Sequence, residues 1–139
     1  MTIIFNKISI IGLGLIGTSI LHALKVKEDK KVLTFAYDIN PQHRSIVSEM
    51  KIATYVCDDI KETVQEADLI ILAIPVGSMK SVANLIAPHL KPEALVTDTG
   101  STKLSVIKDV MSSIPTNNYF IPSHPLAAVS YTHLTLPTM

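Results

Sequence analysis

This sequence of 139 residues has one cysteine and no formal net charge, and each of these two features excludes several kinds of protein. Cys57 is the single cysteine, so the chain has no internal disulfide framework, and no CxxC pair offers a metal site. Twelve basic residues balance twelve acidic ones, which leaves no global field to attract nucleic acid or an anionic membrane. One thiol and the absence of a basic, cleavable leader fit a cytoplasmic protein.

Apolar residues, by contrast, are plentiful. They make up 47% of the chain, charged residues make up 17%, and the mean hydropathy is +0.37. This composition is too apolar for a disordered chain and is typical of a sheet that is buried on both faces. The length suffices for one domain with its own core.

The longest uncharged run lies between Lys7 and Lys25 and has two interpretations. As a helix, its seventeen residues would span only ~26 Å, short of the ~30 Å hydrocarbon core of a bilayer. Its glycines stand at positions 12, 14 and 17, which is not the GxxxG spacing of packed membrane helices. We therefore expect no membrane span, and interpret the run as a strand that turns into a helix.

The rest of the chain repeats this alternation of strand and helix. Short β-branched or apolar runs predict strands in residues 7–13, 30–38, 53–57, 68–75, 94–100 and 118–122. Helical spacing of apolar residues predicts the intervening helices, with buried faces that include Ile16, Ile20, Leu21 and Leu24; Ile46, Val47 and Met50; and Met79, Val82, Ala83 and Ile86. The repeated alternation predicts an α/β fold with a doubly wound, mostly parallel sheet of Rossmann type.

The first strand ends in the pattern G-x-G-x-x-G, which opens the first helix. In such a loop the first glycine permits a tight turn, the second lets pyrophosphate approach the backbone, and the third lets helix and strand pack closely. The helix N-terminus adds unpaired N–H groups and a partial positive charge. We therefore expect Gly12, Gly14, Leu15, Ile16 and Gly17 to bind a dinucleotide cofactor.

Asp38 ends the second predicted strand, twenty-one residues after Gly17. A carboxylate there accepts hydrogen bonds from the ribose hydroxyls of adenosine and repels a 2′-phosphate. This favours NAD over NADP as the cofactor, although the nearby Arg44 would soften the preference. His43 lies in the same region, but the sequence offers no partner for it, and we expect it at the surface.

Three later segments belong at the same edge of the sheet, because ligands of open α/β sheets bind beyond the carboxyl ends of the strands. Ala73, Ile74 and Pro75 follow the fourth strand, where the nicotinamide half should pass. The segment DTGSTK, with Ser101 and Lys103, follows the fifth strand. The segment SHP follows the sixth.

The segments GLGLIGTS, YDIN, ADLIILAIPV, VTDTGSTK and SHPLA, in this order, resemble the prephenate and arogenate dehydrogenases of tyrosine biosynthesis. The resemblance covers roughly residues 7–127, and its most specific part is D-x-G-S-x-K followed later by H-P-[ML]-A. It implies an NAD-dependent oxidoreductase that decarboxylates prephenate or arogenate, a small-molecule substrate. It also implies a homodimer for the full-length enzyme, formed by a second, largely helical domain.

The resemblance also implies roles for individual residues. His124 matches the catalytic histidine that accepts the proton of the substrate's ring hydroxyl, and Ser101 matches the serine that helps to hold this hydroxyl and the histidine. Ser101 is also assigned to the cofactor site. Lys103 matches the motif's lysine and is assigned to the substrate side without a defined role. No metal site is expected.

The sequence departs from the family after SHPLA. The family continues with glycine and an acidic residue, whereas Ala128 stands here and the chain ends VSYTHLTLPTM, without acidic residues, lysine or arginine. We hypothesise that residues 128–139 are a translated sequencing adapter joined to a truncated gene; the alternative is a divergent natural terminus. The dinucleotide-binding domain would then comprise residues 1–127, and the helical dimerisation domain would be absent. Such a chain would bind NAD weakly and would not turn over prephenate at a useful rate.

Two other functions remain open at this point. Other dehydrogenases of the β-hydroxyacid type share the glycine loop, although D-x-G-S-x-K with H-P is not their expected pair. A dinucleotide-binding module without catalysis would also explain Gly12, Gly14, Gly17 and Asp38.

Overall fold

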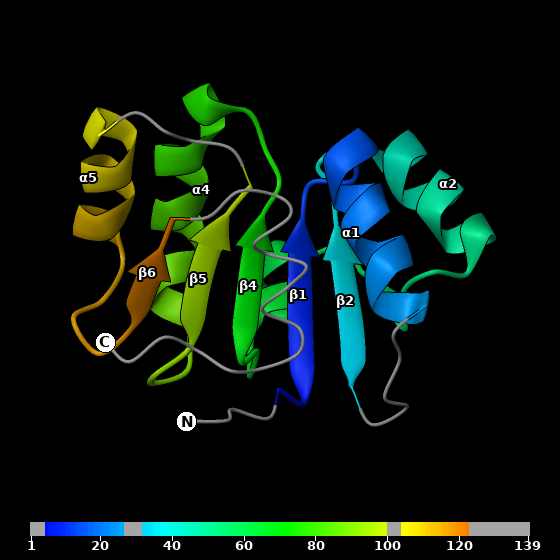
Figure 1. Ribbon diagram of the computed structural model, residues 1–139, viewed down its shortest axis with the longest axis horizontal. Coiled ribbons are helices and arrows are strands. Elements are labelled where there is room, and N and C mark those ends of the chain that lie inside the picture. Colours follow the sequence, from blue (N-terminus) through cyan, green and yellow to red (C-terminus); the bar gives the residue numbers. More distant parts are fainter. Residues whose placement is uncertain (1–4, 27–31, 100–103, 123–139) are drawn as a thin grey trace.

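The chain folds around a parallel sheet of six strands, as the alternation of apolar runs predicts (Figure 1). The computed structural model describes residues 5–26, 32–99 and 104–122. The strands are β1 (Lys7–Ile11), β2 (Leu33–Tyr37), β3 (Tyr55–Val56), β4 (Leu69–Leu72), β5 (Leu95–Asp98) and β6 (Tyr119–Ile121). Their spatial order is β3-β2-β1-β4-β5-β6 and every pairing is parallel. The prediction of a doubly wound Rossmann-type sheet is confirmed.

Helices cover both faces of this sheet. They are α1 (Leu15–Val26), α2 (Pro41–Met50), α3 (Ile60–Val64), α4 (Met79–Ile86) and α5 (Leu104–Ser113), with 3-10 turns η1 (Val76–Ser78) and η2 (Ala87–His89) flanking α4. One core cluster joins the sheet to α1 and α2, and the other joins it to α3, α4 and α5. None of the helices in the described ranges is long and apolar enough to cross a membrane.

In the central strand β4, an unbroken apolar run fills the cores on both faces of the sheet. Leu69 and Ile71 pack into the cluster under α1 and α2, whereas Ile70 and Leu72 pack into the cluster on the opposite face. All four side chains are buried. A strand with only alternating apolar residues would have left one of these two cores without its central side chains.

Local capping fixes the start of α2. The side chain of Asn40 accepts a hydrogen bond from the backbone N–H of Gln42 at 2.9 Å, and Pro41 occupies the first helical position. Both features stabilise a helix N-terminus, because the cap satisfies a free N–H and the proline has none to satisfy. This cap holds the loop that follows β2 and carries Asp38.

Two predicted helix faces are only partly buried. In α1, Ile20, Leu21 and Leu24 are buried but Ile16 is exposed, because the first turn lies beyond the carboxyl end of the sheet. In α2 only Val47 is buried, and its predicted companions Ile46 and Met50 are exposed. The physical reason is position: α2 covers the edge of the sheet beside β3, which has two residues, so little sheet surface lies beneath it.

The order of the strands also creates a topological switch point at the carboxyl edge. From β1 the chain proceeds to β2, whereas from β4 it proceeds to β5 on the other side, and β1 and β4 are neighbours. Ile11 at the end of β1 pairs with Tyr37 of β2 and with Leu72 of β4, so the three following loops begin side by side. Ligands of doubly wound sheets bind at such a switch point.

Candidate functional site

The glycine loop leaves β1 through a conformation that requires glycine. Gly12 has a φ of +104°, and a Cβ at this position would lie 2.2 Å from the carbonyl oxygen of Ala73. The N–H of Gly12 donates to the carbonyl of Tyr37 at 2.8 Å, which ties the loop to the end of β2. The turn is therefore held between the loops that follow β2 and β4.

The other two glycines of the loop meet opposite environments. A Cβ on Gly17 would lie 1.8 Å from the carbonyl oxygen of Gly12, so α1 packs directly on the loop. Among the residues that the structure describes, a Cβ on Gly14 would meet nothing within 4 Å. The space at Gly14 is the kind of opening through which a diphosphate can approach the backbone.

The N-terminus of α1 faces this open space. Leu15 begins the helix and is 86% exposed, and the next residue, Ile16, is also exposed. The first N–H groups of a helix have no acceptor within it, and the helix dipole places a partial positive charge there. The first intrahelical bond in this region runs from Thr18 N–H to the Gly14 carbonyl at 3.0 Å. The position suits a bound anion such as a phosphate group.

Asp38 lies directly after β2 and its carboxylate faces the glycine loop. One carboxylate oxygen, Oδ2, accepts the N–H of Leu13 at 2.7 Å, and the other, Oδ1, accepts the N–H of Asn40 at 2.8 Å. Burial raises the pKa of this carboxyl, but the hydrogen bonds from Asn40, Leu13 and His43 outweigh burial, so the pKa of Asp38 lies below its ordinary value. The side chain is therefore a carboxylate at neutral pH.

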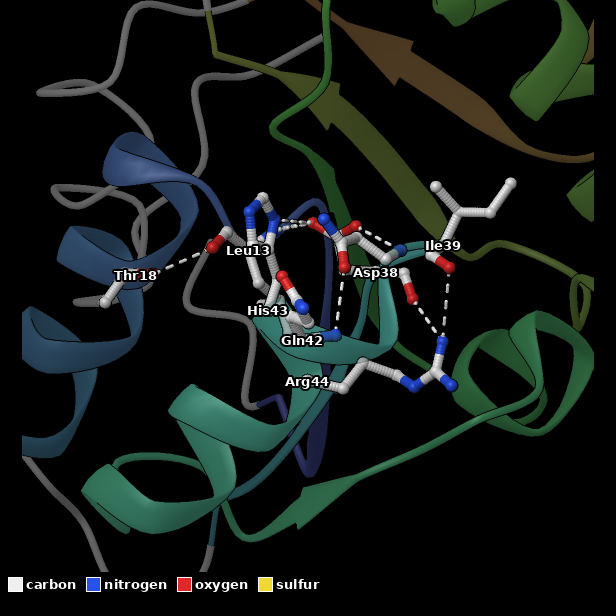
Figure 2. A network of polar contacts seen from close by, with 8 residues as sticks. Leu13, Thr18, Asp38, Ile39, Gln42, His43 and Arg44 are labelled. Carbon is white, nitrogen blue, oxygen red and sulfur yellow. Dashed lines mark hydrogen bonds and ion pairs between the residues drawn. The ribbon is translucent and has the colours of Figure 1, made fainter.

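His43 is the partner of Asp38 that the sequence did not reveal. Its Nδ1 lies 3.2 Å from Oδ2 of Asp38, and the two side chains are 45% and 13% exposed, respectively. Figure 2 shows the imidazole reaching from α2 toward the carboxylate and the glycine loop. The sequence predicted a surface histidine without a partner. The prediction that His43 has no partner was wrong. The signal was the spacing of five residues across a helix cap, which brings the two side chains together.

Arg44 does not approach the carboxylate of Asp38. Its Nη1 donates to the backbone carbonyls of Asp38 and Ile39, at 2.8 Å and 3.4 Å. The guanidinium thereby braces the loop from the side opposite the carboxylate in Figure 2. In this conformation the arginine supports the loop, and it does not neutralise the carboxylate directly.

Ile39 is a second residue that sequence reasoning missed. Its side chain is 84% exposed and points away from the polar contacts around Asp38 (Figure 2). An aliphatic side chain so exposed beside a ligand-binding loop offers an apolar surface for a flat ring. The sequence signal would have been an isoleucine directly after the acid that ends β2.

The loop after β4 lies on the other side of the switch point. Ala73 donates its N–H to the Ile11 carbonyl at 2.8 Å, and its own carbonyl lies against Gly12. Ala73 and Ile74 are half-buried, while Pro75 is exposed and its carbonyl accepts the N–H of Ser78 at 2.9 Å, opening η1. Ala73 and Ile74 therefore lie beside the first glycine.

The predicted catalytic and substrate residues Ser101, Lys103 and His124 lie outside the described residues. The strand that precedes Ser101, β5, ends at the buried Asp98 beside β4, and Thr99 donates its N–H to the Leu72 carbonyl at 3.2 Å. The chain thus heads for the same edge as the loops after β1 and β4.

A separate hollow of about 460 Å³ lies between α2, β3 and α3. Arg44 lines it on one side, and Asp58 and Glu62 line it on another. Two carboxylates disfavour a phosphate there, so the hollow is a poorer place for a diphosphate than the space at Gly14. Cys57, the single thiol, also borders the hollow; it is buried, and burial raises its pKa.

Residues 22–131 match the family described as the nucleotide-binding domain of prephenate dehydrogenase. The chain belongs to this family. The matched residues begin after Gly17, so the glycine loop and the family match are separate observations.

Three individual relatives agree with the family assignment. Cyclohexadienyl dehydrogenase of Zymomonas mobilis is 43% identical over 124 residues, covering 89% of this chain and 42% of the relative. The crystal structure of A. aeolicus prephenate dehydrogenase with hydroxyphenyl propionate and NAD+ superposes with a TM-score of 0.78 at 25% identity, covering 91% of this chain and 44% of that one. Synechocystis arogenate dehydrogenase gives a TM-score of 0.74 at 25% identity, with 85% and 40% covered. The chain thus spans less than half the length of these relatives.

Proposed function

We propose that this chain binds NAD and is the nucleotide-binding part of a dehydrogenase that oxidatively decarboxylates prephenate or arogenate. The observation that carries the proposal is the Asp38 carboxylate, which is held at the glycine loop by the N–H of Leu13 at 2.7 Å. The family match supports this function over another dehydrogenase of the β-hydroxyacid type. The solved relative from A. aeolicus, which was crystallised with NAD+, supports the choice of cofactor.

The residues around the switch point fit a dinucleotide. The open space at Gly14 and the N-terminus of α1 would receive the pyrophosphate. Asp38 would accept the hydroxyls of the adenosine ribose, and the exposed Ile39 would cover one face of the adenine. The nicotinamide half would extend past Ala73 toward the end of β5. Because Asp38 is ionised at neutral pH, it would repel the 2′-phosphate of NADP.

The proposed chemistry combines this cofactor with the residues of the H-P and S-x-K motifs. When bound, NAD would supply the acceptor for a hydride from the substrate carbon that bears the ring hydroxyl. His124, as a neutral imidazole, would accept the proton of that hydroxyl. Ser101 would help to hold the hydroxyl and the imidazole, and Lys103 is assigned to the substrate without a defined role. Loss of the ring carboxylate as CO2 then makes the product aromatic, so the protein mainly has to position the substrate.

The choice between prephenate and arogenate stays open within this proposal. The three relatives described above carry three different names, namely cyclohexadienyl, prephenate and arogenate dehydrogenase. We also expect the full-length enzyme to be a homodimer.

Calorimetric titration of the purified chain with NAD+ tests the cofactor proposal. Wild-type protein should bind NAD+ more tightly than NADP+. Asp38→Ala should weaken NAD+ binding by about 10- to 100-fold, because a hydrogen bond to a charged group contributes about 1.5–3 kcal/mol. Glu93→Gln is the matched control: it removes one negative charge just before β5, at the opposite edge of the sheet, and should leave the Kd unchanged.

Circular dichroism accompanies each titration, so that loss of binding is separated from loss of fold. A folded wild-type chain that binds neither NAD+ nor NADP+ at millimolar concentrations would contradict the proposed function. Equal affinity of wild-type and Asp38→Ala protein for NAD+ would contradict the role of the carboxylate.

A further inference from the structure

The hydrogen bonds of Asp38 leave little room for a ribose. A carboxylate oxygen accepts about two hydrogen bonds. Oδ2 of Asp38 already faces two groups, the Leu13 N–H at 2.7 Å and His43 Nδ1 at 3.2 Å, whereas Oδ1 accepts one N–H, from Asn40. A ribose diol that bonds to both oxygens therefore finds a free position on Oδ1 but not on Oδ2.

The partner that can leave is the histidine. The Leu13 N–H belongs to the backbone of a loop that is fixed by Gly12 and α1. The imidazole of His43 stands on a half-exposed side chain at the first turn of α2, and its contact with Oδ2 is the longer of the two. Rotation of one side chain would release Oδ2 to a ribose hydroxyl without moving the backbone.

We propose that His43 is a positioning residue that competes with the adenosine ribose for Asp38, so that its protonation sets how strongly the site prefers NAD over NADP. The inference rests on the proposed function, since it concerns the same cofactor site. It assigns to this site a dependence on pH that Asp38 alone would not provide.

The direction of the effect follows from charge. A neutral imidazole gives up one ordinary hydrogen bond to Asp38 when the ribose arrives and regains one with water. A protonated imidazole gives up an ion pair, which is harder to break, so NAD+ binds more weakly in acid. The same positive charge offsets the carboxylate that faces a 2′-phosphate, so NADP+ is rejected less. Both effects lower the preference for NAD+ once the imidazole is protonated.

Two charged groups beside His43, Arg44 and Asp38, keep their charge over the pH range of the experiment below. A second histidine of the neighbouring elements, His22 on α1, is present in both proteins that are compared there. Arg44, the next residue of α2, stays protonated and donates to the Asp38 carbonyl. The glycine loop contributes only backbone groups, and the loop at residues 73–78 has no titratable side chain. On α1 the titratable residues are the exposed His22 and Lys25, of which Lys25 donates to the Lys51 carbonyl at the far end of α2. Asp38 itself remains ionised, because its pKa is lowered.

The experiment measures the Kd of NAD+ and of NADP+ for the full chain between pH 5.5 and 8.5 at constant ionic strength. The measured quantity is the Kd of NADP+ divided by the Kd of NAD+. On acidification this ratio should fall for wild-type protein, by about 3- to 10-fold more than it does for His43→Asn. The asparagine keeps a neutral donor but cannot be protonated. The 2′-phosphate of NADP+ also titrates near pH 6, but it does so equally with both proteins and cancels in the comparison.

His89→Asn serves as the control, because His89 lies in η2, at the amino-terminal edge of the sheet before β5. It should behave as wild type. Identical pH profiles for wild type and His43→Asn would overturn the inference while leaving NAD binding intact. Absence of any binding by folded wild-type protein would instead contradict the proposed function.

A second measurement keeps the inference testable if His43→Asn does not fold. The protonation of His43 in wild-type protein can be followed by NMR with and without NAD+. By reciprocity of linked equilibria, NAD+ should shift this protonation to lower pH. No shift at saturating NAD+ would overturn the inference.

Discussion

Replacing Gly17 by alanine tests how closely α1 packs on the glycine loop. The added Cβ would lie 1.8 Å from the carbonyl oxygen of Gly12, whereas real Cβ contacts essentially never fall below 3.0 Å. The helix would therefore have to move away from the loop by more than an ångström. The obstacle is backbone, so no side-chain rotation relieves it. Overpacking typically costs about 1–3 kcal/mol, and we expect Gly17→Ala to lose at least about 3 kcal/mol of unfolding free energy.

Gly14→Ala is the matched control, because a Cβ there meets nothing within 4 Å in the described part of the chain. Its stability should be unchanged, or raised by about 0.4–1 kcal/mol through the lower entropy of the unfolded chain. Urea unfolding followed by far-UV circular dichroism measures both variants. If Gly17→Ala matches wild type within about 0.5 kcal/mol, the close packing described here is wrong. The same control informs on function: Gly14→Ala should weaken NAD+ binding in spite of its stability, because the methyl group enters the open space.

Two further predictions concern residues outside the cofactor site. Asp68 accepts hydrogen bonds from two backbone N–H groups at the start of β1 and forms an ion pair with Lys91. Asp68→Ala should therefore lower the free energy of unfolding at pH 7 by about 1–3 kcal/mol. The control Asp58→Ala, at an exposed aspartate, should leave it nearly unchanged in urea unfolding. Burial raises the pKa of Asp68, but its hydrogen bonds and Lys91 outweigh burial, so the folded pKa lies below the ordinary value. The stabilisation by Asp68 is therefore complete above the unfolded pKa of ~3.9. It is lost as the pH falls through the lower folded pKa. A variant whose deficit does not shrink in acid would refute this assignment. Cys57 is buried and its pKa is raised. Its thiol should therefore react with a disulfide reagent at about pH 7.5 far more slowly in folded than in urea-unfolded protein. Equal rates in the two states would show that the thiol is accessible.

Much of the architecture could be predicted because it is encoded locally. The strand positions follow from short β-branched or apolar runs, such as the unbroken apolar run from Leu69 to Leu72. The start of α2 is encoded in Asn40 and Pro41, since a cap depends on neighbouring residues. The spacing of three glycines likewise indicated the turn at Gly12.

The buried faces of the helices were predicted less well, because periodicity identifies an apolar face but not what covers it. Ile46 and Met50 share the face of Val47, yet α2 lies over the short edge strand β3 and only Val47 reaches the core. Ile16 continues the apolar face of α1, but the sheet ends below it. The extent of the neighbouring surface, which is a property of the whole fold, decided each case.

The sequence by itself determined the order of the elements, the glycine turn and the acid at the end of β2, because each depends on residues that are close along the chain. Only the tertiary structure decided what the acid contacts. The N–H of Leu13 reaches Asp38 across twenty-five residues, and His43 reaches it from the next helix. Such contacts depend on the pairing of β1 with β2 and on the angle at which α2 leaves the sheet. Neither is encoded in any short stretch of sequence.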